Sequence, residues 1–198
     1  MITRREGLKS ALLLGIALNV GRGADRASAQ AVSRRGTILV AYFTRTCNTR
    51  VIARQIRRAL DADLFEIRPA EPYPEDYEET VAQASRERES GFEPTLAALV
   101  PNIERYETVF LGFPIWGMSA PSVIRSFLSK HDLSGKSLIP FITHGGYGLG
   151  DSLSVVSVHA PKARLLDGFA LEADQERRTL EQVTRWLGEF SSLNGQSQ

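Results

Sequence analysis

The sequence predicts an α/β protein built on a doubly wound parallel sheet. Its strand-like segments are continuous apolar runs, as expected of strands that are buried on both faces. The segments between them carry apolar residues at helical spacing. Strands and helices alternate along the chain, which predicts helices on both faces of the sheet. Ligands of such sheets bind at the carboxyl ends of the strands, so the loops that follow the strands are the first place to look for function.

The first half of the pattern begins with a buried strand expected at 37–43. A helix is expected at 48–60, because four apolar residues recur there at helical spacing. These four residues are Ile52, Ile56, Ala59 and Leu60. A shorter strand is expected at 63–67. The next helix is expected to begin near Pro74, followed by acidic residues that suit the positive end of the helix dipole, and to end near Gly91.

The second half contains two more buried strands, at 108–113 and 137–143, and a weaker fifth strand at 164–171. A helix is expected after Pro121, and the clearest helix of the chain is expected at 173–190. Its expected buried face consists of Leu180, Val183, Leu187 and Phe190, with Trp186 as a further core residue.

Two positions do not fit regular strands. Proline lacks the N–H that a central strand uses in its hydrogen-bond ladder, yet Pro140 lies inside the strand expected at 137–143. The fifth strand is interrupted by the pair Asp167-Gly168.

The composition is that of an ordinary globular domain with nearly balanced charge. The chain has 198 residues, of which 42% are hydrophobic and 24% are charged, with 24 basic and 23 acidic side chains. This balance argues against a nucleic-acid partner, because nucleic-acid-binding proteins concentrate basic residues against phosphates. The single cysteine excludes an internal disulfide and a multi-thiolate metal site. His131 and His159 are too far apart in sequence to suggest a metal site.

The first 29 residues have the layout of an export signal. Paired arginines at 4–5 precede an apolar run at 11–20, and the small residues at 27–29 resemble a cleavage site. Adjacent arginines are typical of twin-arginine signals, and the apolar run is much shorter than the ~20 residues that span a bilayer. We therefore expect 1–29 to be removed and the mature chain to act in the periplasm. A short amphipathic helix and a retained anchor are the alternatives.

Removal of this segment would change the charge balance. Residues 1–29 hold five basic and two acidic side chains, so 19 basic and 21 acidic side chains remain, a net charge of −2 over 169 residues. Cleavage after Ala31 would leave the same charge. Residues 30–36 are expected to be a flexible start, 37–190 the folded domain and 191–198 a disordered tail. No membrane-spanning segment is expected in the mature chain.

The loop after the first strand has the composition of an anion site. Residues 44–49 combine three hydroxyls, an amide, an arginine and the free N–H groups of a helix N-terminus. Helix capping would use similar residues, but five polar groups in six positions exceed what a cap requires. The chain lacks the G-x-x-x-x-G-K-[ST] loop of nucleoside triphosphatases. It also lacks the arginine that cysteine phosphatases carry six residues after the cysteine, because Ala53 holds that position after Cys47.

Three loops of the chain resemble those of the flavodoxin-like family. The sequence YFTRTCNT at 42–49 is similar to the family's T/S-x-T-G-N-T loop, which holds the phosphate of FMN. PIWGMSAP at 114–121 and THGGYGLG at 143–150 are similar to the family's loops after the third and fourth strands. The resemblance extends over nearly the whole mature chain. It implies a flavodoxin-like sheet of five strands in the order 2-1-3-4-5 and one non-covalently bound FMN.

The resemblance assigns the FMN site to these three loops. The site would comprise Thr44, Arg45, Thr46, Cys47, Asn48 and Thr49 of the first loop, Pro114, Ile115, Trp116, Gly117 and Met118 of the second, and Thr143, His144, Gly145, Gly146, Tyr147 and Gly150 of the third. A flavin ring is flat and apolar with a polar pyrimidine edge, so it needs aromatic walls and backbone hydrogen-bond groups. Trp116 and Tyr147 are the expected walls. The glycines of the third loop allow the backbone to approach the polar edge.

Two residues are expected to tune the flavin. Flavodoxins place a flexible peptide beside flavin N5, where its carbonyl accepts the proton gained on one-electron reduction. By resemblance Gly117 takes this place, because glycine makes a peptide flip sterically easy. His144 is expected either beside the pyrimidine edge or in solvent. No nucleophile or acid–base pair is evident in the sequence, so the redox chemistry would belong to the flavin.

Cys47 departs from the family pattern, which has glycine at this position. If the position requires a positive φ, a side chain costs on the order of 1 kcal/mol and loosens the phosphate loop. If φ is ordinary, cysteine is tolerated. A small, packed cysteine is favoured here over a redox role.

The sequence thus predicts an exported FMN-binding electron-transfer protein. It would be either a carrier or a small oxidoreductase that takes electrons from NAD(P)H or a quinol, with a redox protein or a small molecule as its partner. No G-x-G-x-x-G dinucleotide motif follows a strand. The alternative is a flavin-free binding module on a degenerate flavodoxin fold, which Cys47 supports. The sequence leaves the oligomeric state open.

Overall fold

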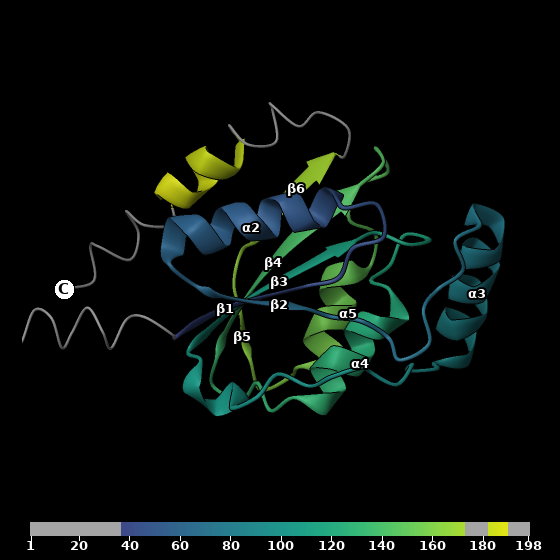
Figure 1. Ribbon diagram of the computed structural model, residues 1–198, viewed down its shortest axis with the longest axis horizontal. Helices are drawn as coiled ribbons and strands as arrows, with labels where there is room; N and C mark the ends of the chain where they lie inside the picture. Colours follow the sequence, from purple (N-terminus) through teal and green to yellow (C-terminus); the bar gives the residue numbers. More distant parts are fainter. Residues whose placement is uncertain (1–36, 173–181, 190–198) are drawn as a thin grey trace, which may run out of the picture. The chain divides into compact units, whose positions relative to one another are not determined.

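The computed structural model describes residues 37–172 and 182–189 (Figure 1). The expected export signal, the flexible start at 30–36 and the tail at 191–198 lie outside the described residues. Leu180 and Phe190, two members of the expected C-terminal helix face, also lie outside them.

The core of the fold is a parallel sheet in the order β2-β1-β3-β4-β5, which confirms the expected fold class and strand order. Its strands are β1 (Ile38–Tyr42), β2 (Asp63–Glu66), β3 (Thr108–Pro114), β4 (Ser137–His144) and β5 (Arg164–Leu165). A further strand, β6 (Phe169–Glu172), also pairs with β4 in parallel. The crossovers between these parallel strands bring all of their carboxyl ends to one edge.

Apolar residues on both faces of the strands form two separate cores. Leu39 and Ala41 of β1 belong to the core under α4 (Ser122–Lys130). Val40 and Tyr42 belong to the core under α2 (Asn48–Leu60). Successive side chains of a strand point to opposite faces, which is why the strand needs apolar residues at every position.

The helices cover both faces of the sheet, as expected. In Figure 1, α2 and the yellow helix at 182–189 lie on one face, and α4 and α5 (Ser152–His159) lie on the other. Val183 and Leu187 are buried in the same core as α2. The predicted core residue Trp186 packs beside them, with its ring centroid 5.3 Å from that of Phe169 and 5.8 Å from that of Phe110.

Helix α3 (Tyr77–Ser90) begins three residues later than the expected start at Pro74. Asp76 is its N-cap, and the Asp76 carboxylate accepts a hydrogen bond from the N–H of Glu79 at 2.9 Å. The helix ends at Gly91, as expected, and the φ of 68° at this glycine gives it a left-handed end. A single 3₁₀ turn at Ile103–Arg105 precedes β3 and was not expected.

Helix α5 was also not expected from the sequence. Its residues, SLSVVSVH, are rich in serine and β-branched valine, which have low helix propensity, and the apolar residues do not follow a helical stripe. The fold requires a covering segment here, because the chain must cross from β4 to the parallel strand β5. Tertiary packing therefore decides the conformation of this segment.

The two irregular strand positions explain each other. The carbonyl of Leu138 accepts the N–H of Leu166 at 2.9 Å, so the backbone of Pro140, two residues on, also faces the outer strand. There the expected fifth strand is divided into β5 and β6 around Asp167-Gly168. Because no ladder partner stands opposite Pro140 at this break, its missing N–H leaves no donor site unfilled.

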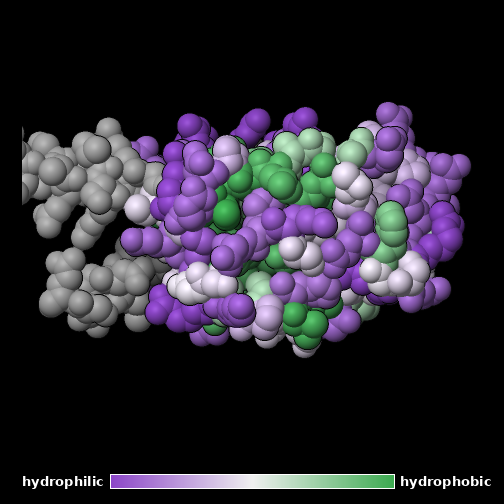
Figure 2. Space-filling model, turned by 90° about the horizontal axis from the view of Figure 1, so that it is seen from below, coloured by the Kyte–Doolittle hydropathy of each residue, from purple (hydrophilic) through white to green (hydrophobic). Residues whose placement is uncertain are grey.

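The described surface mixes polar and apolar side chains. Figure 2 shows one face on which hydrophilic residues cover most of the area and apolar residues show between them. No helix in the described part of the chain is long and apolar enough to cross a membrane.

Candidate functional site

The three loops expected to bind a ligand meet at the carboxyl edge of the sheet. The hydroxyls of Thr49 and Thr143 lie 3.0 Å apart in a buried contact that joins the first loop to the third. The N–H of Ile115 donates to the carbonyl of Thr143 at 2.8 Å, and the N–H of Asp151 donates to the carbonyl of Met118 at 2.9 Å. The structure therefore brings together segments that are about 30 to 100 residues apart in sequence.

The first loop leaves the N-terminus of α2 available for an anion. Cys47 is the N-cap, and no side chain caps the helix there. The first N–H groups of a helix have no intrahelical partner, and the helix dipole places positive charge beside them. The buried hydroxyl of Thr44 also has no hydrogen-bond partner among the described residues. An uncapped helix end and an unpaired buried hydroxyl in one loop fit a phosphate group.

Cys47 adopts a left-handed conformation, with φ 69° and ψ −7°. This is the strained case that the sequence comparison with glycine anticipated. The expectation of a packed cysteine is wrong, because Cys47 is exposed. Arg50 Nη1 donates a hydrogen bond to the thiol sulfur at 3.5 Å.

The two cationic side chains near the first loop have different partners. Arg45 Nη2 donates to the carbonyl of Glu75 at 2.7 Å, which directs the guanidinium toward the start of α3. Arg50 Nη2 lies 2.8 Å from Glu66 Oε1 beside the N-terminus of α2. Burial alone would raise the pKa of Glu66, but hydrogen bonds from Arg68 and Arg50 hold it below its ordinary value. The sequence does not predict this contact of Arg50, because Arg50 lies on α2 and its partner Glu66 lies on β2.

The second loop folds as a tight turn. The backbone groups of Trp116 and Ser119 exchange two hydrogen bonds, at 2.9 and 3.1 Å. Gly117 and Met118 between them have φ values of 55° and 64°, which is the pattern of a two-residue type I′ turn. A Cβ at Gly150 would overlap the carbonyl oxygen of Met118, so glycine allows the third loop to pack closely against this turn.

Trp116 is fixed by neighbouring aromatic rings. Its ring lies edge-on to Phe43 and Tyr73, with centroid distances of 5.2 and 4.8 Å. The Tyr73 hydroxyl donates to Glu87 Oε2 at 2.9 Å. The pKa of Tyr73 is raised, mainly because the hydroxyl is buried and also because the negative charge of Glu87 lies nearby. Glu87 itself is buried. Tyr73 therefore supports the Trp116 ring by packing against it.

Two cavities flank the Trp116 ring. The larger, of about 500 Å³, is lined by Thr44, Tyr73 and the segment at 66–75. The smaller, of about 270 Å³, lies between α3 and the second loop, and we call it the α3 cavity. Residues of the third loop line neither of these two cavities.

The third loop is the most open part of the predicted site. Gly146 and Gly148 have positive φ values of 96° and 78°. The N–H of Gly146 donates to Nδ1 of His144 at 3.2 Å, which fixes the imidazole against its own loop. Tyr147 is 80% exposed, so its role as a flavin wall stays a prediction. Among the described residues, no group of three potential metal ligands lies close enough to hold an ion.

Comparison with known proteins shows which family the chain belongs to. The sequence model of the flavodoxin family matches residues 37–190. The chain belongs to the flavodoxin family. No curated protein matches the sequence.

Solved structures of the flavodoxin fold are similar to the chain over most of their length. A protein designated a flavoprotein from Bacteroides eggerthii is 33% identical, with a TM-score of 0.67 over 78% of this chain and 98% of its own. A second, from Bacteroides uniformis, is 29% identical, with a TM-score of 0.66 over 75% of this chain and 98% of its own. A flavoprotein in complex with FMN from Lactobacillus acidophilus shares the fold at 18% identity, with a TM-score of 0.61 over 68% of this chain and 92% of its own.

Proposed function

We propose that this flavodoxin-family protein binds one FMN without a covalent bond, at the edge of the sheet where the three loops meet. The observation that carries the proposal is the first loop, in which the uncapped end of α2 and the unpaired hydroxyl of Thr44 offer a place for a phosphate. Support comes from the family and from the FMN complex of the Lactobacillus acidophilus protein.

The residues of the three loops would divide the work of binding. The N–H groups of 46–49 would hold the phosphate, and the hydroxyl of Thr44 would complete its hydrogen bonds. Trp116 would pack against the ring, and Tyr147 would close on it from the exposed third loop. The backbone of 144–150 would face the polar edge of the ring. When bound, FMN supplies the one- and two-electron redox chemistry, while the protein binds and orients it.

The activity that we propose is electron transfer outside the cytoplasm. The protein would serve as a carrier or as a small oxidoreductase for NAD(P)H or quinone-type partners. The export signal expected at 1–29 supports a periplasmic location, since the twin-arginine route is read from paired arginines such as those at 4–5. Incubation with NAD(P)H alone separates the two versions, because only the oxidoreductase would bleach its flavin.

Purification of the protein lacking 1–29 tests FMN binding directly. We expect a yellow protein that releases FMN on denaturation and takes it up again on refolding. Thr44→Val should weaken FMN binding by about tenfold, because a hydrogen bond to a charged phosphate is lost. Thr95→Val, outside the three loops, is the control. A colourless protein that cannot be reconstituted with FMN would contradict the proposal and favour a flavin-free binding module, for which the strained Cys47 is the supporting observation.

A further inference from the structure

The α3 cavity is a binding space that adjoins the predicted flavin site and shares part of its lining. One wall comes from α3, through residues such as Val81 and Ala84, and the other comes from Ile115, Trp116 and Gly117 of the second loop. The volume of about 270 Å³ is slightly below that of typical ligand pockets, which run from ~300 to ~1,000 Å³. The cavity therefore suits a molecule of one or two rings.

Two guanidinium groups line this cavity, and none of its described lining residues is acidic. Arg45 donates to a backbone carbonyl, that of Glu75, and its guanidinium lies 5.8 Å from the Tyr77 ring. Arg88 Nη2 donates to the Ser85 hydroxyl at 3.1 Å. These contacts are all with neutral groups, so the positive charges at the cavity wall are not neutralised by a direct carboxylate partner.

The nearest carboxylate is linked to Arg88 only through a hydroxyl. Ser85 Oγ donates its proton to Glu89 Oε1 at 3.0 Å while accepting from Arg88. Glu89 is exposed and does not line the cavity. The guanidinium of Arg88 thus keeps N–H donors for a further acceptor.

Gly117 makes room for one of these cations. A Cβ at Gly117 would overlap Arg88 Nη1, so the guanidinium lies directly against the backbone of the second loop. The side chains on the same walls are apolar, and Trp116 presents an aromatic ring. Two cationic donors beside an apolar, aromatic wall match a flat organic anion, whose charge pairs with the guanidinium groups and whose ring packs on the wall.

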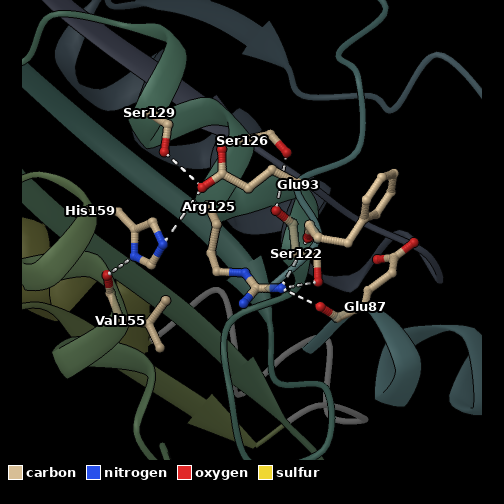
Figure 3. A network of polar contacts seen from close by, with 9 residues as sticks. Glu87, Glu93, Ser122, Arg125, Ser126, Ser129, Val155 and His159 are labelled. Atoms are coloured by element: carbon tan, nitrogen blue, oxygen red, sulfur yellow. Dashed lines mark hydrogen bonds and ion pairs between the residues drawn. The ribbon is translucent and has the colours of Figure 1, made fainter. Parts of the chain in front are cut away.

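The α3 wall is held in place before any ligand binds. Arg125 Nη2 of α4 donates to the carbonyls of Glu87 and Phe92 at 2.9 and 3.1 Å and to Ser122 Oγ at 2.7 Å (Figure 3). These bonds fix the carboxyl end of α3 against α4. A wall that is already ordered costs little conformational entropy on binding.

We propose that the α3 cavity binds a small, flat organic anion of the aromatic carboxylate or sulfonate class, as a ligand separate from FMN. The binding itself does not depend on the proposed function. A role of this ligand beside the flavin does depend on it, because six of the twelve lining residues also belong to the predicted flavin site. These are Arg45, Thr46, Pro114, Ile115, Trp116 and Gly117.

Calorimetric titration of the FMN-loaded protein tests this proposal, with naphthoate as the anionic probe and naphthamide as its neutral counterpart. We expect naphthoate to bind at least about tenfold more tightly than naphthamide, because the guanidinium groups recognise its charge. Arg88→Gln should remove most of this difference and leave the FMN affinity unchanged. Arg86→Gln, on the exposed side of the same helix, should behave as the wild type.

Two further measurements keep the result interpretable. Ala84→Phe fills the cavity while both arginines stay in the chain, so it should abolish binding of both probes. Titration of the flavin-free protein with naphthoate tests the cavity independently of the FMN proposal, because naphthoate should still bind even if the protein does not bind FMN. Equal affinity of wild type and Arg88→Gln for naphthoate would overturn the inference. So would displacement of naphthoate by FMN, which would assign the cavity to the flavin itself.

Discussion

Cys47 shows how one residue can weaken a binding loop through backbone strain. Its φ of 69° is costly for any residue with a Cβ, by roughly 1 kcal/mol or somewhat more. We predict that Cys47→Gly raises the FMN affinity several-fold and raises the free energy of unfolding by at most about 1 kcal/mol, because glycine also gains freedom in the unfolded chain. Flavin-fluorescence titration and urea unfolding measure these two effects.

Asp61, at the other end of α2, provides the matched control for Cys47. Its φ of 49° is also left-handed, so Asp61→Gly makes the same backbone change far from the first loop. It should alter stability without altering FMN binding. Equal effects of the two glycine substitutions on FMN affinity would show that strain at Cys47 does not weaken phosphate binding.

His131 makes the stability of the fold depend on pH. Its Nε2 accepts the N–H of Val100 at 2.9 Å and its Nδ1 lies 2.8 Å from the carbonyl of Phe127, so a neutral ring with its proton on Nδ1 satisfies both contacts. Burial lowers the pKa of His131. The unfolded chain therefore binds the proton first as the pH falls, and the folded state loses stability below about pH 6.5.

We predict that the free energy of unfolding of the wild type falls by on the order of 1 kcal/mol between about pH 7 and pH 5 through this residue. His131→Gln should flatten that slope, even though it is less stable at neutral pH. His159→Gln leaves the buried ring in place and should keep the wild-type slope. Denaturant unfolding across this pH range is the measurement, and equal slopes in the wild type and His131→Gln would refute the assignment.

At the scale of the element, the divided fifth strand depends on a close contact. A Cβ at Gly168 would overlap the carbonyl oxygen of Pro140, and this backbone atom cannot move aside as a flexible side chain could. We predict that Gly168→Ala lowers the free energy of unfolding by about 1–3 kcal/mol. Gly188→Ala meets no atom within 4 Å and should be neutral or slightly stabilising, since alanine favours a helix. Thermal unfolding of both variants measures this difference in stability. Equal melting temperatures would show that the backbone between β5 and β6 can shift to accommodate the added Cβ.

Sequence reasoning succeeded for elements whose own residues determine their structure. The apolar stripe of 48–60 matches the bounds of α2, and Gly91 ends α3 as expected. It failed for α5, because serine and valine carry no helical signal and the crossover alone imposes the helix. Pro140 and Gly168 were each recognised as irregular, but their relation depends on a strand pairing that neither residue reveals alone.

The same limit applies to the candidate site. The three loops could be placed because each directly follows a buried strand, and the carboxyl ends of parallel strands meet. Three contacts of the site could not be predicted from the sequence. They are the contact between Thr49 and Thr143, the packing of Tyr73 against Trp116, and the approach of Arg88 to the second loop. These contacts join segments whose separation in sequence gives no indication of their distance in the fold.

At the scale of the whole molecule, the basic excess of the chain lies in the segment proposed to direct export. Residues 1–29 carry five of the 24 basic side chains but only two of the 23 acidic ones. If the twin-arginine pair at 4–5 is read by the export machinery, the replacement of both arginines by lysine should retain the protein in the cytoplasm, although the charge is unchanged. Cell fractionation followed by mass determination measures both location and cleavage.

A second arginine pair, at 34–35, gives the control for this experiment. Replacement of this pair by lysine makes the same substitution outside the expected signal, in the part of the chain that would remain after cleavage. Export and removal of 1–29 should therefore be unaffected. A cytoplasmic location of the wild type would refute the export proposal, whereas an exported but uncleaved chain would indicate a retained anchor. Because FMN binding is proposed for 37–190 alone, either outcome would leave the flavin site intact, and a yellow protein retained in the cytoplasm would show that FMN binding does not depend on export.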